Sequence, residues 1–151
     1  MSPAYAGIFT TSRVFPIEPK HGHSEIAVVF TSVEATVGTL KHAGVLARQL
    51  DARIAIIVPQ VVPWPLDLTS PPVPLEFNEA RFRAIASQIG VPTEVRIYLC
   101  RDFTQTVTRV LRPGSIVMVG GRSRWWPTAE KRLGGRLRRA GHTVIFTAAE
   151  E

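Results

Sequence analysis

The sequence predicts an α/β fold, a five-stranded doubly wound parallel sheet with helices on both faces. Short, continuously apolar runs such as residues 26–30 and 54–58 are typical of strands that are covered on both faces. Amphipathic stretches with apolar residues three or four positions apart separate these runs. The connections are short, so successive strands and helices form βαβ units with parallel strands. A chain of 151 residues that is 45% hydrophobic has the material for one such domain.

The first part of the chain differs from the rest. Residues 1–24 contain three prolines and no sustained periodicity, and we expect them to form an N-terminal arm. The α/β domain then spans residues 25–149. Its first strand covers residues 26–30 and precedes an amphipathic helix with Ser32 as its N-cap. Asp51 closes this helix, and residues 53–58 form the second buried strand.

A proline-rich stretch follows the second strand. Six prolines fall between Pro59 and Pro74, and proline removes a backbone donor and fixes φ. We therefore expect residues 59–74 to form a semi-rigid loop rather than a strand or a helix. A helical stripe comes next and ends at Gly90; its apolar members are Phe77, Ala80, Ala84 and Ile85.

The last third of the chain supplies two helices and three strands. Residues 94–99 alternate polar and apolar side chains, which is typical of a strand at or near an edge. Asp102 can cap a short helix that ends at Pro113. The fourth strand, residues 115–119, runs directly into Gly120 and Gly121. A basic helix over roughly residues 128–139 and a fifth strand over residues 144–147 complete the alternation.

Composition excludes several protein classes. Cys100 is the lone cysteine, so the chain holds no internal disulfide, and a reducing compartment is favoured. No stretch approaches the ~18 consecutive apolar residues that suggest a membrane span. The N-terminus has no basic residue ahead of its apolar part, as a secretory signal would. We expect a cytoplasmic protein with no membrane span.

Candidate catalytic and metal-binding residues are few. His42 is expected on a helix surface, His142 in a turn, and Cys100 is expected to be buried at a strand end. His21 and His23 lie one residue apart, with no third ligand candidate near in sequence. We assign no catalytic residue and no metal site, and an enzyme is the least supported function.

The charge of the chain is unevenly distributed. Residues 101–141 contain ten basic and two acidic residues, a net charge of +8, within a chain of net charge +6. Two interpretations stay open: an anionic ligand or partner, and a basic face that is simply solvated.

Ligands of open α/β sheets bind outside the carboxyl ends of the strands, where the strand order reverses. Three segments are expected there: residues 30–32, Val58 with the proline-rich loop, and residues 120–124. Adjacent glycines let backbone N–H groups approach a ligand. The following helix N-terminus favours negative charge, and Arg122 and Arg124 add guanidinium groups that suit phosphate. A tight strand-to-helix turn is the alternative explanation of Gly120 and Gly121.

Over residues 25–148 the sequence resembles the universal stress protein (UspA-like) family, with its adenine-nucleotide alpha hydrolase-like fold. The pieces that match are IAVVFTSVEATVGTLKHAGVLARQLDARIAIIV, IVMVGGRSRWWPTAEKRLGG and the ending RLRRAGHTVIFTA. Many members of that family bind ATP through a motif G-x2-G-x9-G-[ST]. The spacing of this motif is kept here from Gly121 to Gly135.

Three positions depart from the nucleotide-binding pattern. Arg124 stands at the second motif glycine, Gly135 at the final Ser/Thr, and Phe30 at the acidic residue that ends the first strand. Some members of the family lack the motif and bind no nucleotide. If ATP binds here, the resemblance places it against ten residues: Thr31, Ser32, Val58, Gly120, Gly121, Arg122, Ser123, Arg124, Gly134 and Gly135. Arg124 then either replaces a backbone contact with charge or fills the site and excludes phosphate.

The resemblance and the charge also suggest partners. The family pairs through its last strand, so residues Thr143–Thr147 are expected to form a homodimer interface. A second hypothesis is a nucleotide-free scaffold whose basic final helix docks an acidic protein partner. A third is nucleic-acid binding through residues 101–141 and Trp125–Trp126. No other aromatic and basic stripe supports a nucleic-acid track, so this third hypothesis is not favoured.

Overall fold

The structure is a computed structural model, and it describes residues 9–15, 25–69, 71, 75–121 and 129–148. Most of the predicted N-terminal arm, the segment from Arg122 to Arg124 and the pair Trp125–Trp126 lie outside the described residues.

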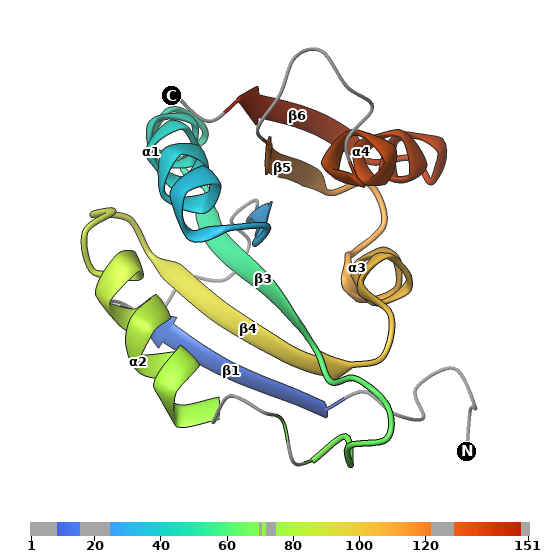
Figure 1. Ribbon diagram of the computed structural model, residues 1–151. Helices are drawn as coiled ribbons and strands as arrows, with labels where there is room; N and C mark the ends of the chain where they lie inside the picture. Colours follow the sequence, from blue (N-terminus) through green and yellow to red (C-terminus); the bar gives the residue numbers. More distant parts are fainter. Residues whose placement is uncertain (1–8, 16–24, 70, 72–74, 122–128, 149–151) are drawn as a thin grey trace.

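One mixed sheet of six strands forms the centre of the molecule (Figure 1). Five strands are parallel: β2 (Glu25–Val29), β3 (Arg53–Val61), β4 (Thr93–Cys100), β5 (Ile116–Gly121) and β6 (Thr143–Ala148). Their order is β4-β3-β2-β5-β6, which confirms the predicted doubly wound sheet. The chain moves from β2 to one side of the sheet and then returns to the other side of β2. The strand order therefore reverses between β2 and β5, which defines the ligand-binding end of such a sheet.

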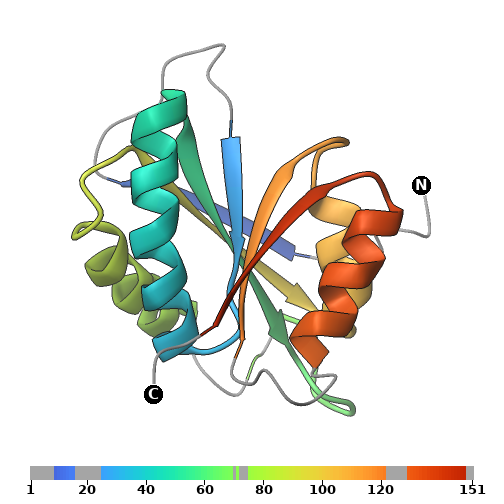
Figure 2. The same ribbon diagram turned by 90° about the horizontal axis from the view of Figure 1, so that it is seen from above.

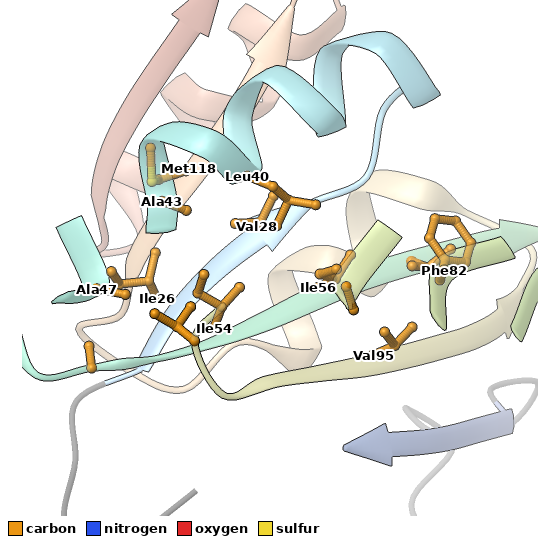
Figure 3. Close-up of a cluster of buried hydrophobic side chains, with 14 of the residues drawn as sticks. Ile26, Val28, Leu40, Ala43, Ala47, Ile54, Ile56, Phe82, Val95 and Met118 are labelled. Carbon is orange, nitrogen blue, oxygen red and sulfur yellow. The ribbon is translucent and has the colours of Figure 1, made fainter. Parts of the chain in front are cut away.

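Among the described residues, four helices cover the two faces of the sheet (Figure 2). The helices α1 (Val33–Leu50) and α2 (Leu75–Ala86) pack on one face, while α3 (Phe103–Val110) and α4 (Ala129–Arg139) pack on the other. Side chains of a strand alternate between faces, so each continuous apolar run supplies both cores. Figure 3 shows the core beneath α1 and α2; its largest fully buried members include Ile26, Leu40, Ile54, Ile56, Phe82 and Met118.

Side-chain caps fix the beginnings of two helices, as the sequence predicts. The Ser32 hydroxyl accepts a hydrogen bond from the Ala35 backbone N–H at 3.2 Å, and the Asp102 carboxylate accepts one from the Gln105 N–H at 2.8 Å. These acceptors satisfy N–H groups that have no partner inside a first helical turn. Asp51 ends α1 in the left-handed region, with φ of 52°.

The sixth strand was not predicted from the sequence. Within the expected arm, β1 (Phe9–Phe15) pairs antiparallel with β4, where Phe9 lies opposite Leu99 and Phe15 opposite Thr93. The strand β4 was expected near an edge, and it does border the parallel part of the sheet. The added strand β1 occupies that border.

Two further expectations were wrong. The strand β3 continues through Pro59 to Val61, because β2 ends earlier and leaves β4 as the neighbour of this part of β3. Proline is tolerated where one side of a strand needs no donor. In α2, Phe77 is 62% exposed, and Phe82, which the predicted stripe omitted, is 1% exposed and fills the core.

Candidate functional site

The candidate site lies at the carboxyl ends of β2 and β5, where the strand order reverses. Thr31 follows β2 and donates its hydroxyl to the Gly120 carbonyl oxygen at 2.9 Å. The Thr31 backbone N–H is directed toward the Thr36 hydroxyl in the first turns of α1, at 3.4 Å. The structure thus brings together Thr31, Ser32 and Gly120, as predicted for this end of the sheet.

The local structure of Gly120 and Gly121 differs from the one expected from the sequence. Gly120 and Gly121 are the last residues of β5 and pair with Thr147 and Ala148 of β6, so the proposed glycine turn is wrong at these positions. An added Cβ at Gly120 would lie 2.5 Å from the Thr39 Oγ1 atom and 2.7 Å from the Ala35 carbonyl oxygen. An added Cβ at Gly121 would collide with the ring of Phe146. Glycine at both positions is therefore explained by close packing inside the protein.

Threonine hydroxyls fill the space between Gly120 and α1. Thr39 donates to the Ala35 carbonyl oxygen at 2.8 Å, and its Oγ1 atom lies 2.5 Å from that of Thr147 on β6. Thr36 and Thr39 are each 1% exposed. Sequence reasoning missed these residues, although two threonines three positions apart next to the apolar stripe of α1 were a usable signal.

The position of the missing acidic residue is occupied by an aromatic ring. The Phe30 backbone N–H donates to the Ile57 carbonyl oxygen at 2.8 Å. Its side chain packs on the core beneath α1 and α2, edge-to-face with Phe82; the ring centroids lie 4.9 Å apart and the planes meet at 86°. Such pairs add about 0.5–1.5 kcal/mol beyond the burial of their area. Phe30 is thus part of the packing, and at this position it offers no acceptor for a ribose hydroxyl.

The remaining predicted site residues divide into three groups. Val58 is 3% exposed and belongs to the apolar core of the α1 and α2 face. Gly134 and Gly135 lie in the middle of α4, and an added Cβ at Gly134 would lie 3.4 Å from the Cγ1 atom of Val144. Arg122, Ser123 and Arg124 lie outside the described residues, so the structure does not place the centre of the motif.

The charged side chains of the sheet gather away from this site. Arg96 on β4 donates both terminal nitrogens to the Glu25 carboxylate at 2.9 Å, and its Nη2 atom also donates to Glu94 at 2.9 Å. Arg53 donates to Glu25 at 3.2 Å. Burial acts to raise the pKa of Glu25, but the hydrogen bonds and charge of Arg96, with the charges of Arg53 and Arg112, outweigh burial and lower it. These four side chains form an ion-paired network near the amino ends of β2, β3 and β4.

The other candidate reactive groups have structural surroundings. Cys100 is buried at the end of β4, as expected, and burial raises the pKa of its thiol. His142 is buried in the turn before β6, where its Nδ1 atom accepts a hydrogen bond from the Ser115 N–H at 3.2 Å. Cys100 lies at the end of β4 and His142 lies before the start of β6, so the two do not form a reactive pair.

Within the residues that the structure describes, no three His, Cys, Asp or Glu side chains are grouped as metal ligands would be. No described helix combines the length and the apolar character that crossing a membrane requires.

Comparison with known proteins gives one structural match. No family model and no curated protein matches the sequence. The fold is similar to the solved structure of a universal stress protein from Archaeoglobus fulgidus, with a TM-score of 0.54 and 16% sequence identity. The match covers 82% of this chain and 93% of that chain. The chain therefore has a universal stress protein-like α/β fold.

Proposed function

We propose that this chain is a small binding and regulatory module of the universal stress type with a degenerate adenine-nucleotide site, and that it acts without tightly bound ATP. The observation that supports this most is the packing of Gly120 and Gly121. Both lie in a strand, both spaces beside them are filled by the protein, and the Gly120 carbonyl oxygen already accepts from Thr31. A phosphate cradle instead needs glycines in a loop whose N–H groups face a ligand.

Two other residues support the same proposal. Phe30 stands where nucleotide-binding members have an acid, and its ring is engaged with Phe82. Gly134 contributes to the contact between α4 and Val144 of β6. Gly121, Phe30 and Gly134 of the nucleotide-binding pattern therefore all contribute to packing within the protein. This supports the proposal that the site no longer binds a nucleotide.

Nucleotide analysis of the purified protein and calorimetric titration with ATP test this proposal. We expect no co-purified adenine nucleotide and no binding in the micromolar range. Arg124→Gly restores the motif residue, and binding that appears only in this variant indicates that the arginine excludes phosphate. Micromolar ATP binding by the natural chain overturns the proposal. A loss of that binding in Arg124→Gly, by about ten-fold or more, then identifies the arginine as a ligand.

We also propose that the module is a homodimer that pairs through β6. This strand ends the sheet, and its outer edge has no neighbour among the described strands. An unpaired edge of backbone donors and acceptors is a template for pairing with another strand. Light scattering at micromolar concentration should give the dimer mass. A monomer mass that does not change with concentration contradicts this proposal and leaves the one on nucleotide untouched.

A further inference from the structure

Exposed apolar side chains gather where β3 ends and its loop begins. Among the described residues six large apolar side chains are exposed, and three of them lie within residues 61–66: Val61, Trp64 and Leu66, which are 43%, 77% and 40% exposed. The other three are spread over α1 and α2. The loop, drawn in green, extends beyond the end of β3 in Figures 1 and 2. These three side chains are called here the Trp64 tip.

The backbone that carries the Trp64 tip is fixed to the sheet. The Val62 backbone N–H donates to the Cys100 carbonyl oxygen at 2.8 Å. The Leu66 N–H donates to the Pro63 carbonyl oxygen at 3.0 Å and closes a tight turn with Trp64 inside it. Side chains from both sides of this turn are buried in a small core of Val62, Leu68 and Leu99. The apolar side chains are therefore exposed on an ordered backbone, so little conformational entropy is lost when they bind.

Arg101 lies against the indole ring of Trp64. Its guanidinium carbon is 3.8 Å from the ring centroid, and its Nη1 atom donates to the Val62 carbonyl oxygen at 2.8 Å. The Asp67 carboxylate accepts hydrogen bonds from the Thr69 N–H and hydroxyl at 2.9 Å and 2.7 Å. These bonds, with the charge of Arg101, lower the pKa of Asp67. One cation and one anion thus accompany the tip, and the cation is the group stacked on the exposed ring.

The chain as a whole supplies a positive charge. Its net charge is +6, and residues 101–141, which begin at Arg101, contain ten basic and two acidic residues. This net charge does not depend on how individual ion pairs are arranged. It attracts the chain to anionic lipid headgroups within about a Debye length. An apolar anchor alone binds a bilayer weakly and reversibly, whereas an anchor combined with positive charge holds a protein there.

We propose that the Trp64 tip inserts into the surface of an anionic lipid bilayer, with the indole at the level of the headgroups and Arg101 beside their phosphates. Tryptophan favours the interface between membrane and water because its ring is apolar and its N–H is polar. A guanidinium group forms charge-assisted hydrogen bonds with phosphate oxygens. Val61 and Leu66 add apolar area on either side of the ring. This role does not depend on the nucleotide site.

A protein partner fits the Trp64 tip less well, because the tip is small. A tryptophan side chain buries at most about 250 Å², and valine and leucine bury less. A stable interface between two proteins buries about 800 Å² on each side. The three side chains fall short of that area, and the other exposed large apolar side chains of the described residues lie on α1 and α2. Insertion into a bilayer needs only a small anchor and a positive charge.

Co-sedimentation with lipid vesicles at physiological ionic strength tests the proposal. We expect binding to vesicles of phosphatidylcholine with phosphatidylserine, and weaker binding to phosphatidylcholine alone. Trp64→Ala should weaken binding by about ten-fold or more, and Leu66→Ala, which keeps the ring stacked on Arg101, by several-fold. Phe77→Ala on α2 removes another exposed aromatic side chain and should leave binding unchanged. Unchanged binding by Trp64→Ala and Leu66→Ala, or equal binding to both kinds of vesicle, overturns the proposal.

Fluorescence tests whether the ring enters the bilayer. The chain has three tryptophans, so replacing Trp125 and Trp126 by phenylalanine leaves Trp64 as the one fluorescent indole. Its emission should move to shorter wavelength on the anionic vesicles and be quenched by lipids with brominated acyl chains. Vesicle binding without quenching indicates adsorption by charge alone and overturns the insertion. A dimer mass in light scattering that Trp64→Ala reduces to the monomer mass assigns the tip to a second copy of the chain, and it also overturns the proposal.

Discussion

The two glycine pairs of this chain look alike in sequence and have opposite surroundings in the structure. Gly120 and Gly121 lie in β5, and both are enclosed, one by α1 and the other by Phe146. In α4, Gly134 touches β6, whereas an added Cβ at Gly135 would meet only the end of the Arg139 side chain. A glycine pair near a predicted ligand site is therefore ambiguous. What lies beside each Cα, and not the pair itself, distinguishes glycine that packing requires from glycine that packing does not require.

The largest effect is expected at Gly120. The Gly120→Ala variant places a methyl group 2.7 Å from the Ala35 carbonyl oxygen, which belongs to the helix backbone and cannot rotate away. Overpacking of this kind should lower the free energy of unfolding by about 3 kcal/mol. Urea denaturation measures the loss, and Gly38→Ala in α1, where the space is open, is the control. A Gly120→Ala protein as stable as the natural one would show that β5 and α1 are further apart than described.

Gly121 should be more tolerant, because what faces it is a side chain. The Gly121→Ala variant meets the far end of the Phe146 ring, which can move by rotating about its side-chain bonds. We expect a loss of about 1–2 kcal/mol in the free energy of unfolding. Adding Phe146→Leu should recover part of that loss, because residues in contact are not additive. If the losses in unfolding free energy of the two single variants simply add in the double variant, the contact between residue 121 and Phe146 is contradicted.

A third variant tests the hydroxyls that fill the space behind Gly120. Thr39→Val has nearly the same shape but removes the donor to the Ala35 carbonyl oxygen and the partner of the Thr147 hydroxyl. Losing these two side-chain hydrogen bonds should lower the free energy of unfolding by about 1 kcal/mol, as thermal or urea unfolding measures. Thr39→Ser, which keeps the hydroxyl and loses a methyl group, separates the hydrogen bonds from the packing. A Thr39→Val loss no larger than that of Thr39→Ser would refute a role for the hydrogen bonds.

Most of the fold could be predicted because its signals are local. Apolar runs, helix caps at Ser32 and Asp102 and short connections are sufficient to predict a doubly wound sheet of five parallel strands, which the structure contains. The strand β1 could not be predicted in this way, because its pairing with β4 is a contact between segments far apart in the chain. The continuation of β3 through Pro59 likewise depends on where the neighbouring strand β2 ends, which the local sequence does not state.

The candidate site was less predictable than the fold. The position of Thr31 beside Gly120 follows from the rule for parallel sheets, and the structure confirms it. The orientation of Phe30 and the filling of the space beside Gly120 depend on α1 and α2, which the residues of the motif do not reveal. A sequence motif fixes spacing along the chain, whereas a phosphate site also requires empty space beside its glycines.

The smallest expected effect concerns α4, and it is an increase in the free energy of unfolding, whereas the other variants lower it. Gly135→Ala adds a methyl group where an ordinary contact with Arg139 is all that it meets, so helix propensity should raise the free energy of unfolding by about 0.5–1 kcal/mol. Gly134→Ala gains the same propensity but presses on Val144, so its net effect should be smaller. Thermal unfolding of the two variants side by side measures the difference. If Gly135→Ala instead destabilises the chain, then Gly135 too is enclosed by the protein, and the contrast between the two glycine pairs disappears.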